Sequence, residues 1–176
     1  MAKTNDKLNN AKSAKKDEFY TLYCDVENEM INYKSHFKNK IIYCNCDNPY
    51  KSNFFKYFYD NFDELSLKQL ICTSYNKNGK GLMCVVNNPN EELQITELNG
   101  NGDFRSQECT DILNKADIII TNPPFSLFRI YILHLIENNK KFITLGTLNG
   151  IKYKDAFPFI KKGKMWLVTK GNLTLE

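Results

Sequence analysis

The chain has 176 residues, of which 42% are hydrophobic and 25% are charged, and its formal net charge is +4. These proportions are typical of one folded globular domain with a single core, and they exclude an intrinsically disordered chain. The small positive charge permits contact with a polyanion but does not require one.

Six cysteines raise the choice between a metal site and buried thiols. The first twenty residues are rich in lysine and lack an apolar stretch, so they do not resemble a secretory leader, and no window reaches membrane-spanning length. Several cysteines lie in apolar runs, where a thiol behaves as a small hydrophobic group. Cys44 and Cys46 are too close together for a zinc knuckle, and no second pair follows. We expect reduced thiols in a cytoplasmic protein, with a metal site as the less favoured alternative.

The hydrophobic pattern predicts helices and strands in alternation. We expect a mobile, basic N-terminal segment over residues 1–16 and a single core over residues 17–176. In chain order, the predicted elements are a helix over 21–37, a strand over 40–46, a helix over 52–62, a strand over 68–75, a two-stranded hairpin over 81–98, a helix over 106–116, a strand over 117–122, a helix over 125–138, a strand over 141–149, a helix over 153–163 and a strand over 164–172. This order predicts an open, mostly parallel α/β sheet with helices on both faces.

Four segments follow the predicted strands where an open α/β sheet binds its ligands. Such sheets bind beyond the carboxyl ends of their strands, near a topological switch point. The segments are "CNCDNPYKSN" after the first strand, "CTSY" at the end of the second, "GDFRS" after the hairpin and "TNPPF" after the next strand. We expect all four to converge on one rim of the sheet.

The tetrapeptide Asn122, Pro123, Pro124 and Phe125 stands between a predicted buried strand and a helix. Adjacent prolines fix the turn and orient a nearby backbone carbonyl, while the Asn122 side chain adds a second oxygen acceptor. Two acceptors suit an amino group with two hydrogens, and Phe125 offers a face on which a base can stack, worth about 1–3 kcal/mol. The pattern predicts a clamp for the exocyclic amine of a base flipped out of a duplex. The alternative is a proline stop before a helix, with Phe125 in the core.

The run "TNPPF" resembles motif IV of amino-methylating DNA methyltransferases, and "GDFRSQECTDILNKADIIITNPPFSLFRIYI" is similar to the EcoRI-type adenine-specific methyltransferase family. The resemblance extends to "KDEFYT", "IIYCNCDNPYKSNFFKYF" and "IKYKDAFPFIKKGKMWL", and it covers residues 16 to about 168. It implies a Rossmann-like, S-adenosylmethionine-dependent methyltransferase fold. Asn-Pro-Pro-Phe alone also occurs in RNA and protein-glutamine methyltransferases, so these stay alternatives.

The resemblance implies roles for single residues. Asn122 and Pro124 would grip the target amine, Pro123 would set the turn, and Phe125 would stack on the extruded adenine. Asp103 of "GDF" would accept a hydrogen bond from the adenine amine of the cofactor, and Asn122 would also belong to the cofactor-binding residues.

The remaining cofactor contacts implied by the resemblance precede and follow the first strand. Asp47 would meet the ammonium group of the cofactor. The other implied contacts are Phe19, Tyr20 and Thr21 of motif X, at the methionine end of the cofactor, and Cys44, Asn45 and Cys46 of motif I. Motif I here lacks the glycines usual in such enzymes, and the second strand lacks the acid that usually holds a ribose.

These observations lead to one expected activity. The protein would transfer a methyl group from S-adenosylmethionine to the exocyclic amine of a flipped adenine in double-stranded DNA, without a metal, as part of a restriction-modification system. A membrane partner is not expected, and a monomer is favoured. Family members continue past this length into segments that complete the sheet and read the DNA sequence, so we expect an incomplete core. The alternative is a catalytically silent module that binds cofactor or DNA.

Overall fold

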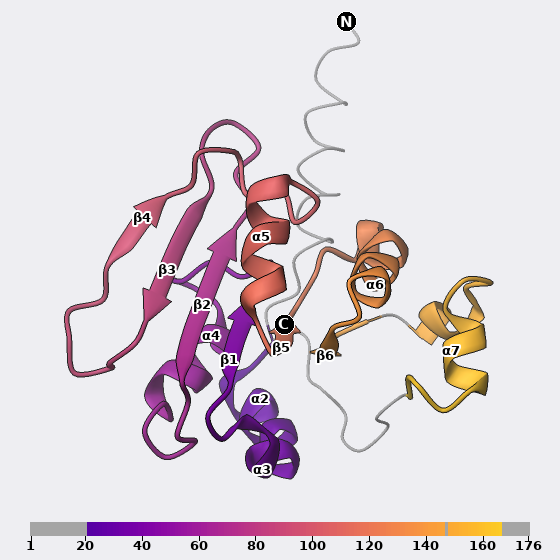
Figure 1. The fold of residues 1–176 in the computed structure, drawn as a ribbon, viewed down its shortest axis with the longest axis horizontal. Helices are drawn as coiled ribbons and strands as arrows, with labels where there is room; N and C mark the ends of the chain where they lie inside the picture. Colours follow the sequence, from indigo (N-terminus) through magenta and orange to yellow (C-terminus); the bar gives the residue numbers. More distant parts are fainter. Residues whose placement is uncertain (1–20, 147, 167–176) are drawn as a thin grey trace, which may run out of the picture.

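A computed structural model describes residues 21–146 and 148–166, which form one six-stranded sheet with helices on both faces (Figure 1). The strand order is β4-β3-β2-β1-β5-β6. The strands are β1 (Ile41–Cys44), β2 (Gln69–Ser74), β3 (Leu82–Val86), β4 (Ile95–Glu97), β5 (Ile118–Thr121) and β6 (Lys141–Thr144). The α-helices are α2 (Tyr23–Met30), α3 (Lys34–Phe37), α4 (Asn53–Asp60), α5 (Gln107–Lys115), α6 (Phe128–Glu137) and α7 (Phe157–Lys161). Three short 3-10 helices are η1 (Ile31–Tyr33), η2 (Phe125–Leu127) and η3 (Leu148–Lys152).

The sheet is mixed and mostly parallel, as predicted. Strands β2, β1, β5 and β6 run in one direction, while β3 is antiparallel to β2 and β4 is antiparallel to β3. Ile42 at the centre of the sheet is paired with Leu70 on one side and with Ile118 on the other. Two reversals bring β4 back to the direction of β2, so the carboxyl end of β4 joins the edge at which the parallel strands end.

The alternation of side chains along the strands divides the core in two. Ile42 and Cys44 of β1 belong to a cluster with residues of α2, α3 and α4, whereas Tyr43 between them belongs to a second cluster with residues of α5 and α6. Ile118 and Ile120 of β5 join the first cluster. Because successive strand residues point to opposite faces, strands that are apolar throughout need helices on both sides.

The crossovers place a topological switch point between β1 and β5. The connection from β1 runs through α4 to β2 on one side, and the connection from β5 runs through α6 to β6 on the other. Open α/β sheets bind ligands at such a point, because the loops that leave the two central strands diverge there. In Figure 1, α6 lies beside β6, with α7 beyond it at the right of the view.

The observed elements differ from the predicted ones mainly at their ends. The helix predicted over 21–37 is interrupted by η1, where the Asn32 side-chain amide donates to the carbonyls of Asn28 and Glu29 at 3.1 and 3.0 Å and competes with the helical ladder. The strand predicted over 141–149 ends at Thr144.

Two predictions concern the ends of the chain. Residues 164–166 of the predicted last strand are not in a strand, and the rest of that strand lies outside the described residues, as does the N-terminal segment over 1–16. Among the residues that the structure describes, no helix is long and apolar enough to cross a membrane.

Candidate functional site

Hydrogen bonds join the loops that leave the carboxyl ends of the strands. The backbone N–H of Asp47, after β1, donates to the carbonyl of Thr73 in β2 at 3.1 Å. The N–H of Cys46 donates to Oγ1 of Thr121, the last residue of β5, at 3.1 Å. The N–H of Asn76, after β2, donates to the carbonyl of Asn101, after β4, at 2.8 Å. The four predicted segments therefore share one rim.

The Asp47 carboxylate links the loop after β1 to the Asn-Pro-Pro-Phe turn. It is buried, and Oδ1 accepts a hydrogen bond from Oγ of Ser52 at 2.6 Å while Oδ2 accepts one from Oγ1 of Thr121. The backbone N–H of Asn122 also donates to this carboxylate. Burial raises the pKa of Asp47 to about 6, although the three hydrogen bonds act to lower it. The carboxylate thus ties the motif I turn to the first residue of the tetrapeptide.

Ser52 has a second role at the same place. Its Oγ accepts hydrogen bonds from the backbone N–H groups of Phe54 and Phe55 at 3.1 and 3.2 Å, so it is the N-cap of α4. Phe54 and Phe55 are buried together with Tyr57 and Phe58, which fixes α4 on the sheet. The start of α4 is therefore held both by its cap and by Asp47.

The Asn45 side chain is occupied by a bond to the helix that follows the tetrapeptide. Oη of Tyr131, in α6, donates to Oδ1 of Asn45 at 2.6 Å, and both residues are buried. The neighbouring Cys44 side chain is fully buried in the core, and Cys46 is half-buried. Contact between Cys44 and a cofactor would therefore involve its backbone only.

The tetrapeptide ends β5 and begins α6. Pro123 is buried, while Asn122, Pro124 and Phe125 are half-buried. The carbonyl of Pro124 accepts a hydrogen bond from the N–H of Leu127 at 3.0 Å, which closes the turn η2. A carbonyl oxygen has two lone pairs, so this bond leaves the Pro124 oxygen able to accept a second hydrogen.

The loop that carries Asp103 lies against the end of β2 because of a glycine. Gly102 has a φ of +78°, and a Cβ there would lie 2.2 Å from the carbonyl oxygen of Ser74, so no other residue fits. Asp103 follows at once, and its carboxylate accepts from Arg105, at 2.9 Å from Nε to Oδ1 and 2.5 Å from Nη2 to Oδ2. The Arg105 guanidinium lowers the pKa of Asp103, which is therefore charged and able to accept further hydrogen bonds.

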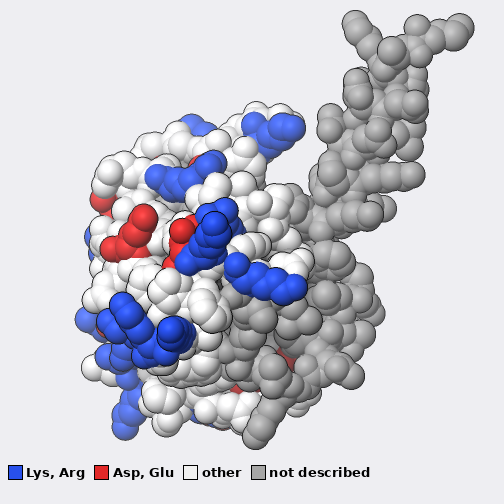
Figure 2. Space-filling view, turned by 90° about the vertical axis from the view of Figure 1, so that its right-hand side faces the viewer, with Lys and Arg blue, Asp and Glu red and all other residues white. Residues whose placement is uncertain are grey.

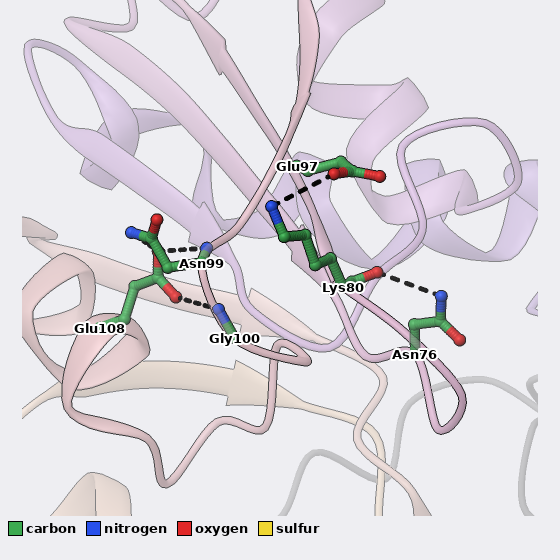
Figure 3. Close-up of polar contacts among 6 residues, drawn as sticks. All are labelled: Asn76, Lys80, Glu97, Asn99, Gly100 and Glu108. Atoms are coloured by element: carbon green, nitrogen blue, oxygen red, sulfur yellow. Dashed lines mark hydrogen bonds and ion pairs between the residues drawn. The ribbon is translucent and has the colours of Figure 1, made fainter.

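Glu108, in the first turn of α5, holds the same loop from the other side (Figure 3). Its Oε1 accepts from the N–H of Asn99 and its Oε2 from the N–H of Gly100, both at 3.0 Å. These bonds lower the pKa of Glu108. Nearby, Lys80, which precedes β3, pairs with Glu97 at the end of β4 at 3.5 Å.

Thr21 is the motif X residue that the structure describes; Phe19 and Tyr20 lie outside the described residues. Thr21 is buried, and its carbonyl accepts from Nδ2 of Asn53, at the start of α4, at 2.8 Å. Its Oγ1 is buried and has no hydrogen-bond partner among the described residues. An unsatisfied buried hydroxyl is costly, so a ligand that bonds to it gains affinity.

The sequence did not point to four residues that organise this rim. They are Ser52, Thr121, Tyr131 and Glu108, the last through its hydrogen bonds to the loop after β4. Ser52 carries a local signal, because serine before an apolar helix is a typical N-cap. Thr121 and Tyr131 carry none, since their partners are 74 and 86 residues away. Groups of three or more possible metal ligands are absent from the described part of the chain.

The sequence was compared with protein families and with known proteins, and the two results agree. The sequence profile of the family described as "Adenine-specific methyltransferase EcoRI" matches residues 7–174. The type II methyltransferase M.EcoRI of Escherichia coli is 46% identical, over 93% of this chain and 55% of its own length. Type II methyltransferase M.MgeORF184P of Mycoplasma genitalium is 42% identical over 96% of this chain and 53% of its own length. M.MpnI of Mycoplasma pneumoniae is 39% identical over 90% of this chain and 49% of its own length.

The chain thus spans about half the length of the curated relatives it matches. No solved structure matches it significantly.

Proposed function

Because the chain belongs to the EcoRI-type adenine-specific methyltransferase family, we propose that it transfers a methyl group from S-adenosylmethionine to the exocyclic amine of a flipped adenine in double-stranded DNA. Membership confirms the resemblance predicted from the sequence. The observation that carries the proposal is the Asp47 junction, where one buried carboxylate bonds both Thr121 and the backbone of Asn122. It sets the amine-binding turn beside the motif I turn, at the switch point of the sheet.

The described residues fit the cofactor. Three groups in or near the motif I turn have suitable chemistry: the buried hydroxyl of Thr21, which has no partner among the described residues, the partly exposed carboxylate of Asp103, and the carboxylate of Asp47. We propose that Thr21 and Asp47 hold the methionine end and that Asp103 holds the adenine amine. When bound, S-adenosylmethionine supplies a methyl group on a sulfonium, which needs no metal to be a strong electrophile.

The tetrapeptide performs the alignment. The Asn122 side-chain oxygen and the Pro124 carbonyl each accept a hydrogen bond from the adenine amine. These two hydrogen bonds would turn the lone pair of the amine nitrogen toward the methyl group. Phe125 stacks on the base, and Pro123 keeps the turn rigid. With S-adenosylmethionine bound, transfer would join the amine nitrogen to the methyl carbon as the sulfur–carbon bond breaks, and the amine would then release one proton to solvent. The adenine amine is nearly non-basic, so positioning, not a strong base, is the contribution of the protein.

Transfer of labelled methyl groups to duplex DNA tests this proposal. We expect the rate for Asn122→Ala to fall on the order of 100-fold, since a misplaced amine loses its alignment. Asn114→Ala is the matched control, because Asn114 is exposed on α5, and it should keep the wild-type rate. Equal rates for Asn122→Ala and the wild type would refute the role of Asn122. Binding of S-adenosylmethionine without product in the wild type would instead identify a cofactor-binding module.

A further inference from the structure

Within the part of the chain that the structure describes, the excess of positive charge is concentrated in one segment. Residues 148–166 contain five lysines and a single acidic residue, Asp155, so their net charge of +4 equals that of the whole chain. Residues 21–146 contain more acidic than basic side chains. A lysine-rich composition alone would not confine the excess of lysines over acidic residues to one of the described segments.

The five lysines of this segment are all exposed, and the set is called here the lysine surface. Its members are Lys152, Lys154, Lys161, Lys162 and Lys164. None of them forms an ion pair with a described residue, whereas Asp155 is paired with Arg129 of α6. Figure 2 shows the face of the molecule on the α7 side, where the blue Lys and Arg side chains gather with fewer red acidic ones between them.

Packing holds this segment against the first turn of α6. The Phe128 ring lies so close to Gly146 and Gly150 that a Cβ at either position would be 2.1 or 2.7 Å from a ring carbon. Nε of Arg129 donates to Oδ2 of Asp155 at 3.1 Å, and the guanidinium lies 5.9 Å from the centre of the Tyr153 ring. Because α6 begins directly after the Asn-Pro-Pro-Phe turn and η2, these contacts place the lysine surface beside the amine-binding turn.

We propose that the lysine surface binds the phosphate backbone of the duplex that flanks the flipped base. The inference rests on the proposed function, because it places the polyanion next to the turn that holds the base. Ammonium groups without carboxylate partners attract phosphates by releasing condensed counterions, and this attraction needs no base sequence. Arg129 is neutralised by Asp155, so the free charge lies on the lysines.

Trp166 provides a reporter at this surface. It is the only tryptophan of the chain, it is 70% exposed, and it lies two residues after Lys164. A duplex that binds the lysine surface should therefore change its fluorescence, whereas a duplex bound elsewhere should not.

The test measures duplex DNA binding at several salt concentrations, by anisotropy of a labelled duplex and by Trp166 fluorescence. Replacement of Lys154, Lys161, Lys162 and Lys164 by Gln should weaken binding at least 10-fold at about 0.1 M salt. The slope of log K against log salt should become shallower by roughly 2 to 4, at about 0.9 per lost phosphate contact. The matched control replaces four exposed lysines by Gln at the amino ends of the parallel strands, away from the rim that binds ligands. They are Lys38, Lys68, Lys115 and Lys141.

The outcomes distinguish failure of the lysine surface as a DNA contact from failure of the proposed methyl transfer. The control should bind like the wild type, and melting curves should show that both variants are folded. Equal affinity and slope for the test variant and the wild type, or a wild type that binds no duplex at low salt, would overturn the lysine surface as a DNA contact. Loss of binding in the test variant together with no methyl transfer by the wild type would overturn the proposed function and leave the lysine surface assigned.

Discussion

Asp47 joins the turns at the rim through its hydrogen bonds, and its burial makes the charged carboxylate energetically unfavourable. Its donors, the Ser52 and Thr121 hydroxyls and the Asn122 N–H, are all uncharged. Burial favours the protonated carboxyl, and the hydrogen bonds favour the carboxylate; burial dominates, so the pKa rises to about 6 from an ordinary value of 3.8. The same carboxylate is proposed to meet the cofactor ammonium, which would stabilise its charged form.

Stability should therefore depend on the protonation of Asp47. An acid whose pKa is higher in the folded state stabilises the fold below its unfolded pKa, and that stability is lost as the pH rises through the folded pKa. Relative to Asp47→Asn, which cannot titrate, the wild type should lose roughly 2 to 3 kcal/mol of unfolding free energy between about pH 4 and pH 7. Urea unfolding of both proteins across this range measures the difference. A difference that stays constant or grows with pH would contradict the assignment.

At the scale of elements, the site is assembled by short contacts that fix loops to helices. The loop after β4 is held by Gly102 against β2 and by Glu108 of α5, and Asp103 takes its position from both. The turn after β1 is held by Tyr131 of α6 through Asn45. Helices that cover the faces of the sheet thus also set the geometry of its rim.

Loss of the Glu108 contacts should act through the Asp103 loop. Glu108→Ala leaves the N–H groups of Asn99 and Gly100 to water, which should cost about 1 kcal/mol of stability because both are exposed. We expect the KM for S-adenosylmethionine to rise several-fold while kcat changes little, since Glu108 touches neither reacting group. The control is Asp111→Ala on the same helix, whose carboxylate accepts only from the Gln107 side chain in the described part of the chain. A fall in kcat with an unchanged KM would contradict this role.

At the scale of the whole molecule, three distant parts of the chain meet at one edge of the sheet. The first strand supplies Asp47, the hairpin insertion leads to Asp103, and the fifth strand leads to Asn122. The lysine surface follows in the last described segment, on the outer side of α6. A cofactor bound between the first two would bridge parts that are far apart in the sequence.

Cofactor binding should therefore stabilise the whole fold. At 100 times its dissociation constant, S-adenosylmethionine adds about 2.7 kcal/mol, which corresponds to a rise in melting temperature of roughly 5 to 10 °C for a domain of this size. Asp103→Asn should lose most of this shift at the same cofactor concentration. Asp60→Asn, which removes a carboxylate paired with an exposed lysine on α4, should keep it. Equal shifts for both variants in thermal melts would remove Asp103 from the cofactor site.

Much of this architecture is present in local patterns. The alternation of strands and helices, the hairpin around Asn88 and Pro89, and the parallel sheet follow from hydrophobic periodicity and turn residues within short windows. The ends of elements were less predictable: β6 stops at Thr144, before the close packing of Gly146 on Phe128, a contact between segments that no window contains.

By itself, the sequence determined the fold class, the family and the rim at which the tetrapeptide lies, because these depend on residue order and on rules of strand connection. Only the tertiary structure decided which side chains meet there. The bond from Thr121 to Asp47 and the bond from Tyr131 to Asn45 join residues 74 and 86 positions apart. Local periodicity holds no information on such pairs, since they form only when the sheet brings its carboxyl ends together.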